Sequence, residues 1–500
     1  MLIPIKLEDN ILHVAMADPL DSQVIQFLQQ KTEKRIQAYI APASTIERTI
    51  SEQYAHSLSS DVNAALKETG SAEPKVEKID KAIKEDIIRD APVAKIVGTI
   101  LEYGLKSRAS DIHIEPLEDR TRIRYRIDGI LTEKLSLPKK VHDAVVSRVK
   151  ILSEMKIDEK RIPQDGRFNF KMEDYEVDLR VSTLPTVHGE KIVMRLLRKT
   201  GGVPSLQDLG LRGTALKNFE AQVVKPHGII LITGPTGSGK TTTLYSVLTK
   251  INTTSVNIIT LEDPVEYQIA GVNQVQINPQ AGLTFASGLR AFLRQDPNII
   301  MVGEIRDRET AELAIQAALT GHLVFSTIHT NSAAGALPRL LDMGGEPFLI
   351  ASSVNAIEGQ RVVRKICQAC KEELTPPSEV IEDLQNVLGT LYSAALERGV
   401  DSTLEGVITN KNQTTKNKPS IFKGKGCSEC GGTGYKGRIG IYEVLVVSEK
   451  IGKLILEHSP ASKIEQQAKE EGMITMKQDG YLKVLEGLTT LEEVLRVAQE

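Results

Sequence analysis

The segment GPTGSGKT, Gly234 to Thr241, has the residue types and spacing of a phosphate-binding loop. Glycines let backbone N–H groups wrap phosphate oxygens, Lys240 supplies a positive charge, and the Thr241 hydroxyl can bind Mg²⁺. A buried-strand pattern, GIILIT, precedes the loop, and a helical pattern, TTTLYSVLTKI, follows it. The sequence therefore predicts a site for ATP and Mg²⁺ formed by Gly234, Pro235, Thr236, Gly237, Ser238, Gly239, Lys240, Thr241 and Thr242.

Two acidic residues follow apolar strand patterns later in the chain. Glu304 ends NIIMVGE, where phosphate-loop enzymes usually carry aspartate as a second Mg²⁺ contact. Glu262, in TLEDPVEY, is a candidate for activating or orienting the attacking water. Because the ends of parallel strands meet at one sheet edge, we expect both acids near the phosphates. Two alternatives stay open: Glu304 is an ordinary strand-end acid, and Glu262 with Asp263 only caps the turn before Pro264.

Two histidines bracket the strand pattern LVFSTIHT. A single histidine beside a strand is more often structural than catalytic, which applies to His322 and His329 alike. Beside a phosphate site, however, His329 could sense the γ phosphate, so it is included among the candidate catalytic residues.

The chain has four cysteines, arranged as two CxxC pairs. Cys367 and Cys370 form CQAC, and Cys427 and Cys430 form CSEC. Four thiolates in two such pairs suit tetrahedral Zn²⁺, with a redox pair or unligated thiols as the alternative. Four protein ligands leave no open coordination position, so we expect an architectural zinc rather than a catalytic one.

Composition restricts the class of protein. The 500 residues carry 62 basic and 65 acidic side chains, a net charge of −3, so no overall positive field favours nucleic acid. The first residues lack the pattern of a signal peptide, and the apolar runs are far shorter than the roughly 20 residues of a membrane-spanning helix. We expect a cytoplasmic protein whose membrane association is peripheral.

The patterns along the chain predict several domains. Residues 1–56 are predicted as a small αβ element with a strand, a turn at Asp18-Pro19, an amphipathic helix and a strand at Arg35 to Ile40. Residues 57–89 are predicted as a linker with some helical tendency. Residues 90–199 are predicted as an α+β domain. Its helix would be capped by Asp90, and its alternating strands would include a hairpin turning near Glu173-Asp174.

The second half of the sequence has a different pattern. Residues 200–366 read as a doubly wound α/β core. Residues 367–440 hold the cysteines and a polar loop, and residues 441–500 read as helical. In that helical region Gly472 is predicted to end one helix, and Thr489 with Glu492 to form a capping box for the last.

Four of these segments, GPTGSGKT, TLEDPVEY, DPNIIMVGEIRD and GHLVFSTIHT, together resemble the nucleotide-site boxes of the ATPases that assemble type II secretion systems and type IV pili. The resemblance extends from SDIHIEPLEDRTRIRYRIDG to GCSECGGTGYKGRIGIYEV and covers roughly residues 90–500. It implies a RecA-like ATPase domain preceded by a PAS-like α+β domain, with a flexible linker near Thr200 to Pro204. It also implies a homohexamer.

The same resemblance implies roles for three arginines of the first domain. By motif position they are Arg167 of PQDGR, Arg180 of VDLRVS and Arg195 of IVMRLL. They would neutralise charge on the γ phosphoryl group during hydrolysis. From strand alternation alone they could equally be solvated strand residues.

Partners are likewise implied by the resemblance. Related motors act on an inner-membrane platform protein and push pilin-like subunits into a filament, and the cysteine module belongs to assembly motors rather than retraction motors. The segment LEDNILHVAMADPLD resembles the later half of an N-terminal domain that docks to a membrane-associated partner and in some members binds cyclic di-GMP. The earlier half is not evident in the sequence, so cyclic di-GMP is not assigned.

Two other classes of function remain open: a DNA-uptake or DNA-translocating motor, and a scaffold that binds ATP without cycling. The first needs a basic groove, and the second a broken nucleotide site. The residues do not separate type II secretion from pilus assembly, although the terminal segment GMITMKQDGYLKVLEGLTTLEEV slightly favours the pilus.

Overall fold

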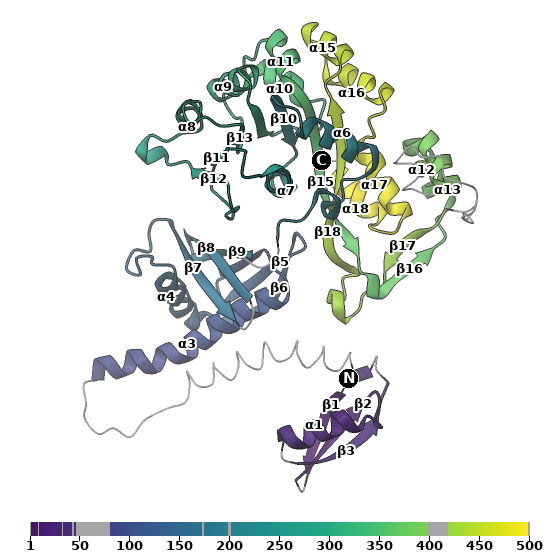
Figure 1. The fold of residues 1–500 in the computed structure, drawn as a ribbon. Coiled ribbons are helices and arrows are strands. Elements are labelled where there is room, and N and C mark those ends of the chain that lie inside the picture. The colour runs from purple at the N-terminus through teal and green to yellow at the C-terminus, as the bar shows by residue number, and fades with distance from the viewer. Residues whose placement is uncertain are drawn as a thin grey trace. The chain divides into compact units, whose positions relative to one another are not determined.

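The computed structural model describes residues 2–8, 10–32, 34–42, 45–46, 81–172, 175–198, 202–398 and 419–498. The chain divides into two compact units, Met1–Thr200 and Gly201–Glu500 (Figure 1). Most of the predicted linker (residues 57–80), part of the predicted polar loop (residues 410–418), the hairpin turn at 173–174 and the start of the predicted interdomain linker (200–201) lie outside the described residues. Among the described residues, no helix is long and apolar enough to span a membrane.

A three-stranded sheet and one helix form the N-terminal part of the first unit. Its elements are β1 (Leu2–Glu8), β2 (Ile11–Met16), α1 (Ser22–Thr32) and β3 (Arg35–Ile40). Strand β1 pairs antiparallel with β2, and β3 pairs parallel with β2 after the α1 crossover. The sequence predicts the helix and β3 correctly but misses β1, because Pro4 and Lys6 interrupt its apolar pattern. An edge strand such as β1 tolerates proline.

The rest of the first unit is a six-stranded antiparallel sheet in the order β6-β5-β4-β9-β8-β7. Helices α3 (Lys81–Lys106) and α4 (His142–Leu152), the latter preceded by η1 (Lys139–Val141), pack through apolar side chains on one face. The strands are β4 (Asp111–Pro116), β5 (Arg120–Ile127), β6 (Ile130–Pro138), β7 (Gln164–Met172), β8 (Tyr175–Thr186) and β9 (Gly189–Arg198).

Helix α3 corrects one prediction. It begins at Lys81, so Asp90 is not its cap, and its first turns fall in the segment predicted as a linker with some helical tendency. Pro92 lies inside the helix, where it forfeits one backbone hydrogen bond. The buried side chains of Val93, Ile96 and Ile100 anchor the following turns to the sheet.

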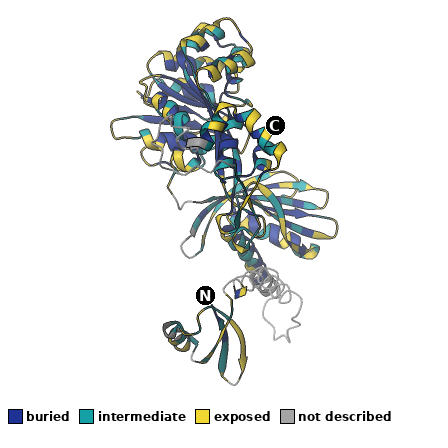
Figure 2. Cartoon of the chain, turned by 90° about the vertical axis from the view of Figure 1, so that its right-hand side faces the viewer, coloured by how far each residue is buried: buried dark blue, intermediate teal, exposed yellow. Residues whose placement is uncertain are grey.

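A seven-stranded sheet in the order β12-β11-β13-β14-β10-β15-β18 forms the core of the second unit. All of its neighbouring strands are parallel except β15 and β18, and its central strands are buried (Figure 2). The strands are β10 (Gly228–Thr233), β11 (Ile258–Glu262), β12 (Asn273–Gln276), β13 (Ile299–Val302), β14 (Leu323–Ile328), β15 (Val354–Ile366) and β18 (Tyr435–Val446).

Helices cover both faces of this sheet. Apolar side chains of α6 and α7 pack on one face, and those of α8 to α11 on the other. Their bounds are α5 (Leu206–Leu209), α6 (Gly213–Val223), α7 (Lys240–Ile251), η2 (Pro279–Ala281), α8 (Phe285–Phe292), α9 (Arg308–Leu319), α10 (Ala336–Asp342) and α11 (Pro347–Ser353). The predicted α/β arrangement is confirmed for this unit.

The cysteine segment lies between two neighbouring strands of the same sheet. Strands β15 and β18 pair antiparallel over almost their whole length, and the predicted boundary at residue 440 falls within β18. The segment between them holds η3 (Gln368–Cys370), β16 (Lys371–Leu374), α12 (Ser378–Leu388), α13 (Thr390–Arg398), β17 (Ile421–Gly424) and η4 (Ser428–Cys430). Strands β16 and β17 pair with each other as a separate two-stranded sheet.

The C-terminal region is helical, as predicted. Its helices are α15 (Glu449–Leu456), α16 (Ala461–Glu470), α17 (Met476–Leu485) and α18 (Leu491–Ala498). Gly472, with φ of 93°, follows the end of α16 as predicted. The predicted capping box of α18 is wrong by one residue: Thr490 accepts from the Glu493 N–H, whereas the Thr489 hydroxyl donates to the Arg364 carbonyl.

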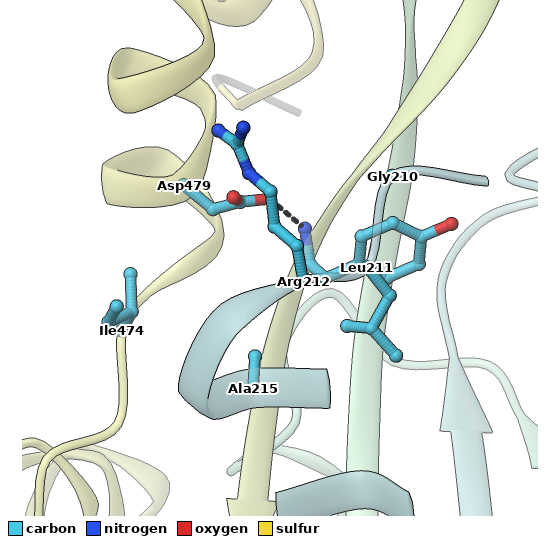
Figure 3. Close-up of a pocket in the computed structure, with 7 residues that line it drawn as sticks. Gly210, Leu211, Arg212, Ala215, Ile474 and Asp479 are labelled. Carbon is cyan, nitrogen blue, oxygen red and sulfur yellow. Dashed lines mark hydrogen bonds between the residues drawn. The ribbon is translucent and has the colours of Figure 1, made fainter. Parts of the chain in front are cut away.

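A buried lysine ties α17 to the start of the second unit. The Lys483 ammonium, fully buried, donates to the carbonyls of Gly210 and Gly440 at 2.8 Å and to Asp479 Oδ2 at 2.6 Å. Asp479 also accepts from the backbone N–H of Tyr442 at 2.8 Å, beside a small pocket that Arg212 lines (Figure 3). The segment before α6, strand β18 and helix α17 therefore share one polar cluster.

A second buried contact involves Glu443 of β18, which is 6% exposed. Its carboxylate accepts from the Ala333 N–H at 2.7 Å and from the Met476 N–H at 3.1 Å. Ala333 lies in the loop after β14, and Met476 is the first residue of α17.

Candidate functional site

The phosphate-binding loop connects β10 to α7. Gly234, Gly237 and Gly239 have φ values of 149°, 82° and 91°, which only glycine adopts readily. A Cβ atom at Gly234 would lie 2.5 Å from the Gln360 carbonyl oxygen of the neighbouring strand β15. The glycines at these positions therefore let the loop turn sharply and pass close to β15.

Lys240, at the start of α7, lies folded over this loop. Its ammonium donates to the carbonyls of Gly234 at 2.8 Å and Pro235 at 3.1 Å. Burial lowers the pKa of Lys240, the nearby charge of Arg361 lowers it too, and the charge of Glu304 opposes the change. Two cations thus lie near the loop, an electrostatic setting that favours an anionic ligand.

Glu304 and His329 come together at the ends of two neighbouring strands. Glu304 follows β13, and His329 follows β14. The His329 Nε2 and Glu304 Oε2 atoms are 3.3 Å apart, and Arg306 contacts the other carboxylate oxygen at 2.6 Å. The Glu304 side chain is 12% exposed. This carboxylate is therefore partly open and close enough to Lys240 to affect its pKa.

Glu262 ends β11 and is more deeply buried, at 3% exposed. Its Oε1 atom accepts from the Thr260 hydroxyl at 2.5 Å and from the Gln274 amide at 3.2 Å. Its Oε2 atom accepts from the Tyr245 hydroxyl. The neighbouring Asp263 is exposed.

Strand order explains how distant segments meet. In the sheet β11, β13, β14 and β10 are consecutive and parallel, so their carboxyl ends share one edge. Glu262, Glu304, His329 and the phosphate-binding loop all follow such ends. His322 precedes β14 and so lies at the opposite edge, where its Nδ1 atom is 2.8 Å from the Ala317 carbonyl. The two histidines therefore lie at opposite edges of the sheet. His329 belongs to the candidate site, and His322 contacts the backbone of α9.

The three candidate arginines form a single row across the first unit's sheet. Arg167 of β7 pairs with Arg180 of β8, which pairs with Arg195 of β9. Directly opposed residues in antiparallel strands lie on the same face, so the three charges repel one another. Asp111 of β4, opposite Arg195, offsets this repulsion: its Oδ1 atom is 3.2 Å from Arg195 Nε.

Glu115, four residues along β4 from Asp111, is the second acid within this basic face. It contacts Arg124 at 2.7 Å, Arg122 at 2.9 Å and Lys191 at 3.1 Å. Burial alone would raise the pKa of Glu115, but the hydrogen bonds from these three cations lower it to about 2. The face therefore keeps its basic side chains ordered around buried carboxylates.

The four cysteines meet as predicted. Their sulfur atoms all lie within 4.8 Å of one another. The Cys367–Cys427 and Cys370–Cys430 sulfur separations are 3.7 and 3.9 Å. Tetrahedral zinc, with Zn–S bonds of about 2.3 Å, requires sulfurs about 3.8 Å apart, whereas a disulfide requires about 2 Å. The donor set therefore fits Zn²⁺.

Backbone groups complete the cysteine cluster. The N–H groups of Cys427 and Gly434 donate to the Cys430 sulfur at 3.1 and 3.2 Å. Such hydrogen bonds stabilise a thiolate, the form that binds metal.

Sequence reasoning missed several residues around the phosphate-binding loop. The Gln360 amide donates to the Ser238 carbonyl at 2.5 Å, and its oxygen accepts from the Thr243 hydroxyl at 2.8 Å. Arg361, 5% exposed, contacts the Asn331 carbonyl at 3.4 Å. No local pattern singles these residues out, because β15 becomes a neighbour of β10 only through the topology of the sheet. Tyr245, which contacts Glu262, was also missed, although its hydroxyl stands within the helical pattern that follows the loop.

Comparison with protein families gives two matches. A family described as "Type II/IV secretion system protein" matches residues 86–496, and the "MshEN domain" family matches residues 1–60. The second range overlaps the element predicted at residues 1–56.

Similar curated proteins come from both kinds of system. The chain is 43% identical over 495 residues to the type IV pilus assembly ATPase PilB of Thermus thermophilus, covering 99% of this chain and 52% of that protein. It therefore spans about half the length of this relative. It is 42% identical over 502 residues to the type II secretion system protein E of Xanthomonas campestris pv. campestris, covering 100% of this chain and 83% of that protein.

Solved structures agree with the fold. The pilus retraction motor PilT with bound ADP is 27% identical with a TM-score of 0.52, covering 80% of this chain and 96% of that one. The Legionella pneumophila ATPase DotB has a TM-score of 0.55 at 20% identity, covering 85% and 98%, a likeness of fold alone. Taken with the family match over residues 86–496, these relatives establish that the chain belongs to the type II/IV secretion system protein family.

Proposed function

We propose that this protein hydrolyses ATP to power the assembly of pilin-like subunits into a type IV pilus or a type II secretion pseudopilus. The observation that carries the proposal is the shared sheet edge at which Lys240, Glu304, His329 and the end of β11 meet. A glycine-rich loop, a lysine and a partly open carboxylate at one edge are groups that phosphoryl transfer uses, and His329 lies beside them.

Each group has a distinct proposed role. The backbone N–H groups from Gly234 to Thr242 and the Lys240 ammonium hold the phosphates. Thr241 and Glu304 fit a Mg²⁺ site, since no described residue hydrogen-bonds the Thr241 hydroxyl and the Glu304 carboxylate is partly open. When bound, Mg²⁺ neutralises charge on the phosphates. Glu262 orients the attacking water, and His329 reports the γ phosphate through its contact with Glu304.

The architecture proposed for this activity is a hexamer of RecA-like domains, each preceded by a PAS-like domain at residues 90–199. Arg167, Arg180 and Arg195 would neutralise charge that develops on the γ phosphoryl group. Their common row on one sheet face supports joint action on a polyanion.

The proposed cellular setting follows the relatives. The protein would be cytoplasmic and peripheral to the inner membrane, with a platform protein as its load and a membrane-associated partner docked at residues 1–56. Relatives named for pilus assembly and for type II secretion match at nearly equal identity, so the proposal covers both systems.

The decisive experiment measures steady-state ATP hydrolysis of wild type, Lys240→Ala and Glu262→Gln, each with its oligomeric state from light scattering. We expect wild type to hydrolyse ATP as a hexamer, Lys240→Ala to lose nucleotide binding, and Glu262→Gln to bind ATP but stall. Binding without turnover by a hexameric wild type would favour a scaffold, and strong stimulation by DNA would favour a DNA motor. Normal turnover by Glu262→Gln would shift the water-orienting role to Glu304.

A further inference from the structure

The Glu262 carboxylate is held by three neutral donors. The Tyr245 hydroxyl donates to Oε2, and Thr260 and Gln274 donate to Oε1 at 2.5 and 3.2 Å. A carboxylate offers about four acceptor positions, two on each oxygen. The described residues therefore fill both positions on Oε1 and one on Oε2, and the position that remains is on the oxygen that Tyr245 contacts.

The direction of the Tyr245 hydrogen bond follows from its other neighbours. Its oxygen accepts from the Glu266 N–H, with 3.2 Å between nitrogen and oxygen, and an ionised carboxylate can only accept. A phenol has one hydrogen of its own, so that hydrogen is left for Glu262. The hydroxyl is thus fixed in orientation by two contacts, since it accepts from Glu266 and donates to Glu262.

The Tyr245 ring is fixed as well. It is fully buried, and it packs edge-on against Tyr267 with centroids 4.6 Å apart at an interplanar angle of 82°. Tyr245 lies on α7, the helix that begins at Lys240. The helix that carries the phosphate-binding lysine therefore also carries a donor to Glu262.

We propose that Tyr245 is a positioning residue for hydrolysis: it orients Glu262 so that the remaining acceptor position on Oε2 receives the attacking water. This inference rests on the role of Glu262 in the proposed function. It adds a physical connection through α7: the helix carries Lys240, which holds the phosphates, and Tyr245, which contacts the water-placing Glu262.

The test compares Tyr245→Phe, which removes only the hydroxyl, with Tyr267→Phe, the matched control whose hydroxyl is not among the donors to Glu262. Tyr245→Phe should lower kcat by about 10- to 100-fold, the size of effect expected for a misplaced reacting group. The KM and the dissociation constant for ATP should stay within about twofold of wild type, since the phosphate contacts are unchanged. Tyr267→Phe should keep the wild-type kcat.

A double-mutant cycle distinguishes positioning from a structural effect. In the Glu262→Gln background, Tyr245→Phe should cost less than about twofold, because its effect acts through the missing carboxylate. An equal loss of kcat in both backgrounds would overturn the inference, as would a wild-type kcat for Tyr245→Phe. If Tyr245→Phe lowers thermal stability, all variants are assayed well below the lowest of their melting temperatures, where each is folded, and the same cycle decides.

The outcomes also separate this inference from the proposal on which it rests. Wild-type turnover by Glu262→Gln removes the role of Glu262, and that of Tyr245 with it. A stalled Glu262→Gln together with a fully active Tyr245→Phe removes only the role of Tyr245.

Discussion

Buried carboxylates of the second unit differ in what surrounds them, and this difference decides what each can do. Burial raises the pKa of Glu358 to about 8, and no described residue hydrogen-bonds its oxygens, so it is mainly protonated at neutral pH. Glu262 is almost as buried but has three donors, and Glu304 is partly open beside two cationic or basic side chains. Only the last two lie at the strand ends near the phosphate-binding loop.

Lys483 provides a prediction at the same scale. Lys483→Met would leave Asp479 buried without its counter-charge, so the second unit should lose about 3–5 kcal/mol of its free energy of unfolding. Thermal and urea unfolding followed by circular dichroism would measure the loss. Lys463→Met, at an exposed position on α16, is the control and should change stability by less than about 0.5 kcal/mol. Equal stability of the two variants would contradict the role of the cluster.

Single residues were predictable where a local pattern carries the chemistry. The spacing of GPTGSGKT identifies Lys240, and a glycine after an apolar strand identifies Glu304. Two donors to Glu262 were not predictable, because Tyr245 of α7 and Gln274 of β12 come from elements whose adjacency to β11 is a property of the folded sheet. Thr260 lies two residues before Glu262 on β11 itself, so strand alternation places it on the same face. The Arg361 charge near Lys240 was not predicted, because β15 becomes a neighbour of the loop only in the folded sheet.

At the scale of elements, the cysteine segment joins two strands that pair with each other. Strands β15 and β18 are neighbours, and the chain between them leaves the sheet and returns to it. The four cysteines lie together where this segment leaves β15 and where it returns to β18. A metal there would fix the ends of a long irregular connection, and such sites contribute directly to folding free energy.

Removal of the metal tests this arrangement. Metal analysis should find about one zinc per chain, and Cys427→Ser should lose the zinc and lower the melting temperature, because three remaining thiolates bind zinc less tightly. Ser428→Ala, the adjacent position, should keep both the zinc and the melting temperature. A zinc-free wild type that is folded and as stable as the zinc-loaded protein would be the contrary result.

Elements were predicted well where apolar periodicity is strong, and poorly where tertiary packing overrides a local signal. The core strands of the second unit follow from their continuous apolar runs. Helix α3 continues through Pro92 because its later turns are anchored on the sheet, which the sequence does not reveal. The cap of α18 shifted to Thr490 because the Thr489 hydroxyl is used by Arg364 of β15.

At the scale of the whole molecule, the basic row of the first unit and the phosphate-binding loop of the second are proposed to act on one nucleotide. Arg180→Ala and Arg195→Ala should each lower kcat by about 10³-fold or more while changing the ATP dissociation constant much less. Arg120→Ala, an exposed arginine of β5 outside the row, is the control and should keep the wild-type kcat. A defect in ATP binding with normal kcat would refute the proposed role of the row.

The Glu443 contact has a consequence at this scale. One carboxylate joins the backbone of the loop after β14, at Ala333, to the first N–H of α17, at Met476. The two backbone segments cannot move apart without breaking a buried hydrogen bond. A displacement of the loop after β14 would therefore shift the start of α17 with it, so this single side chain makes the two segments move as one unit.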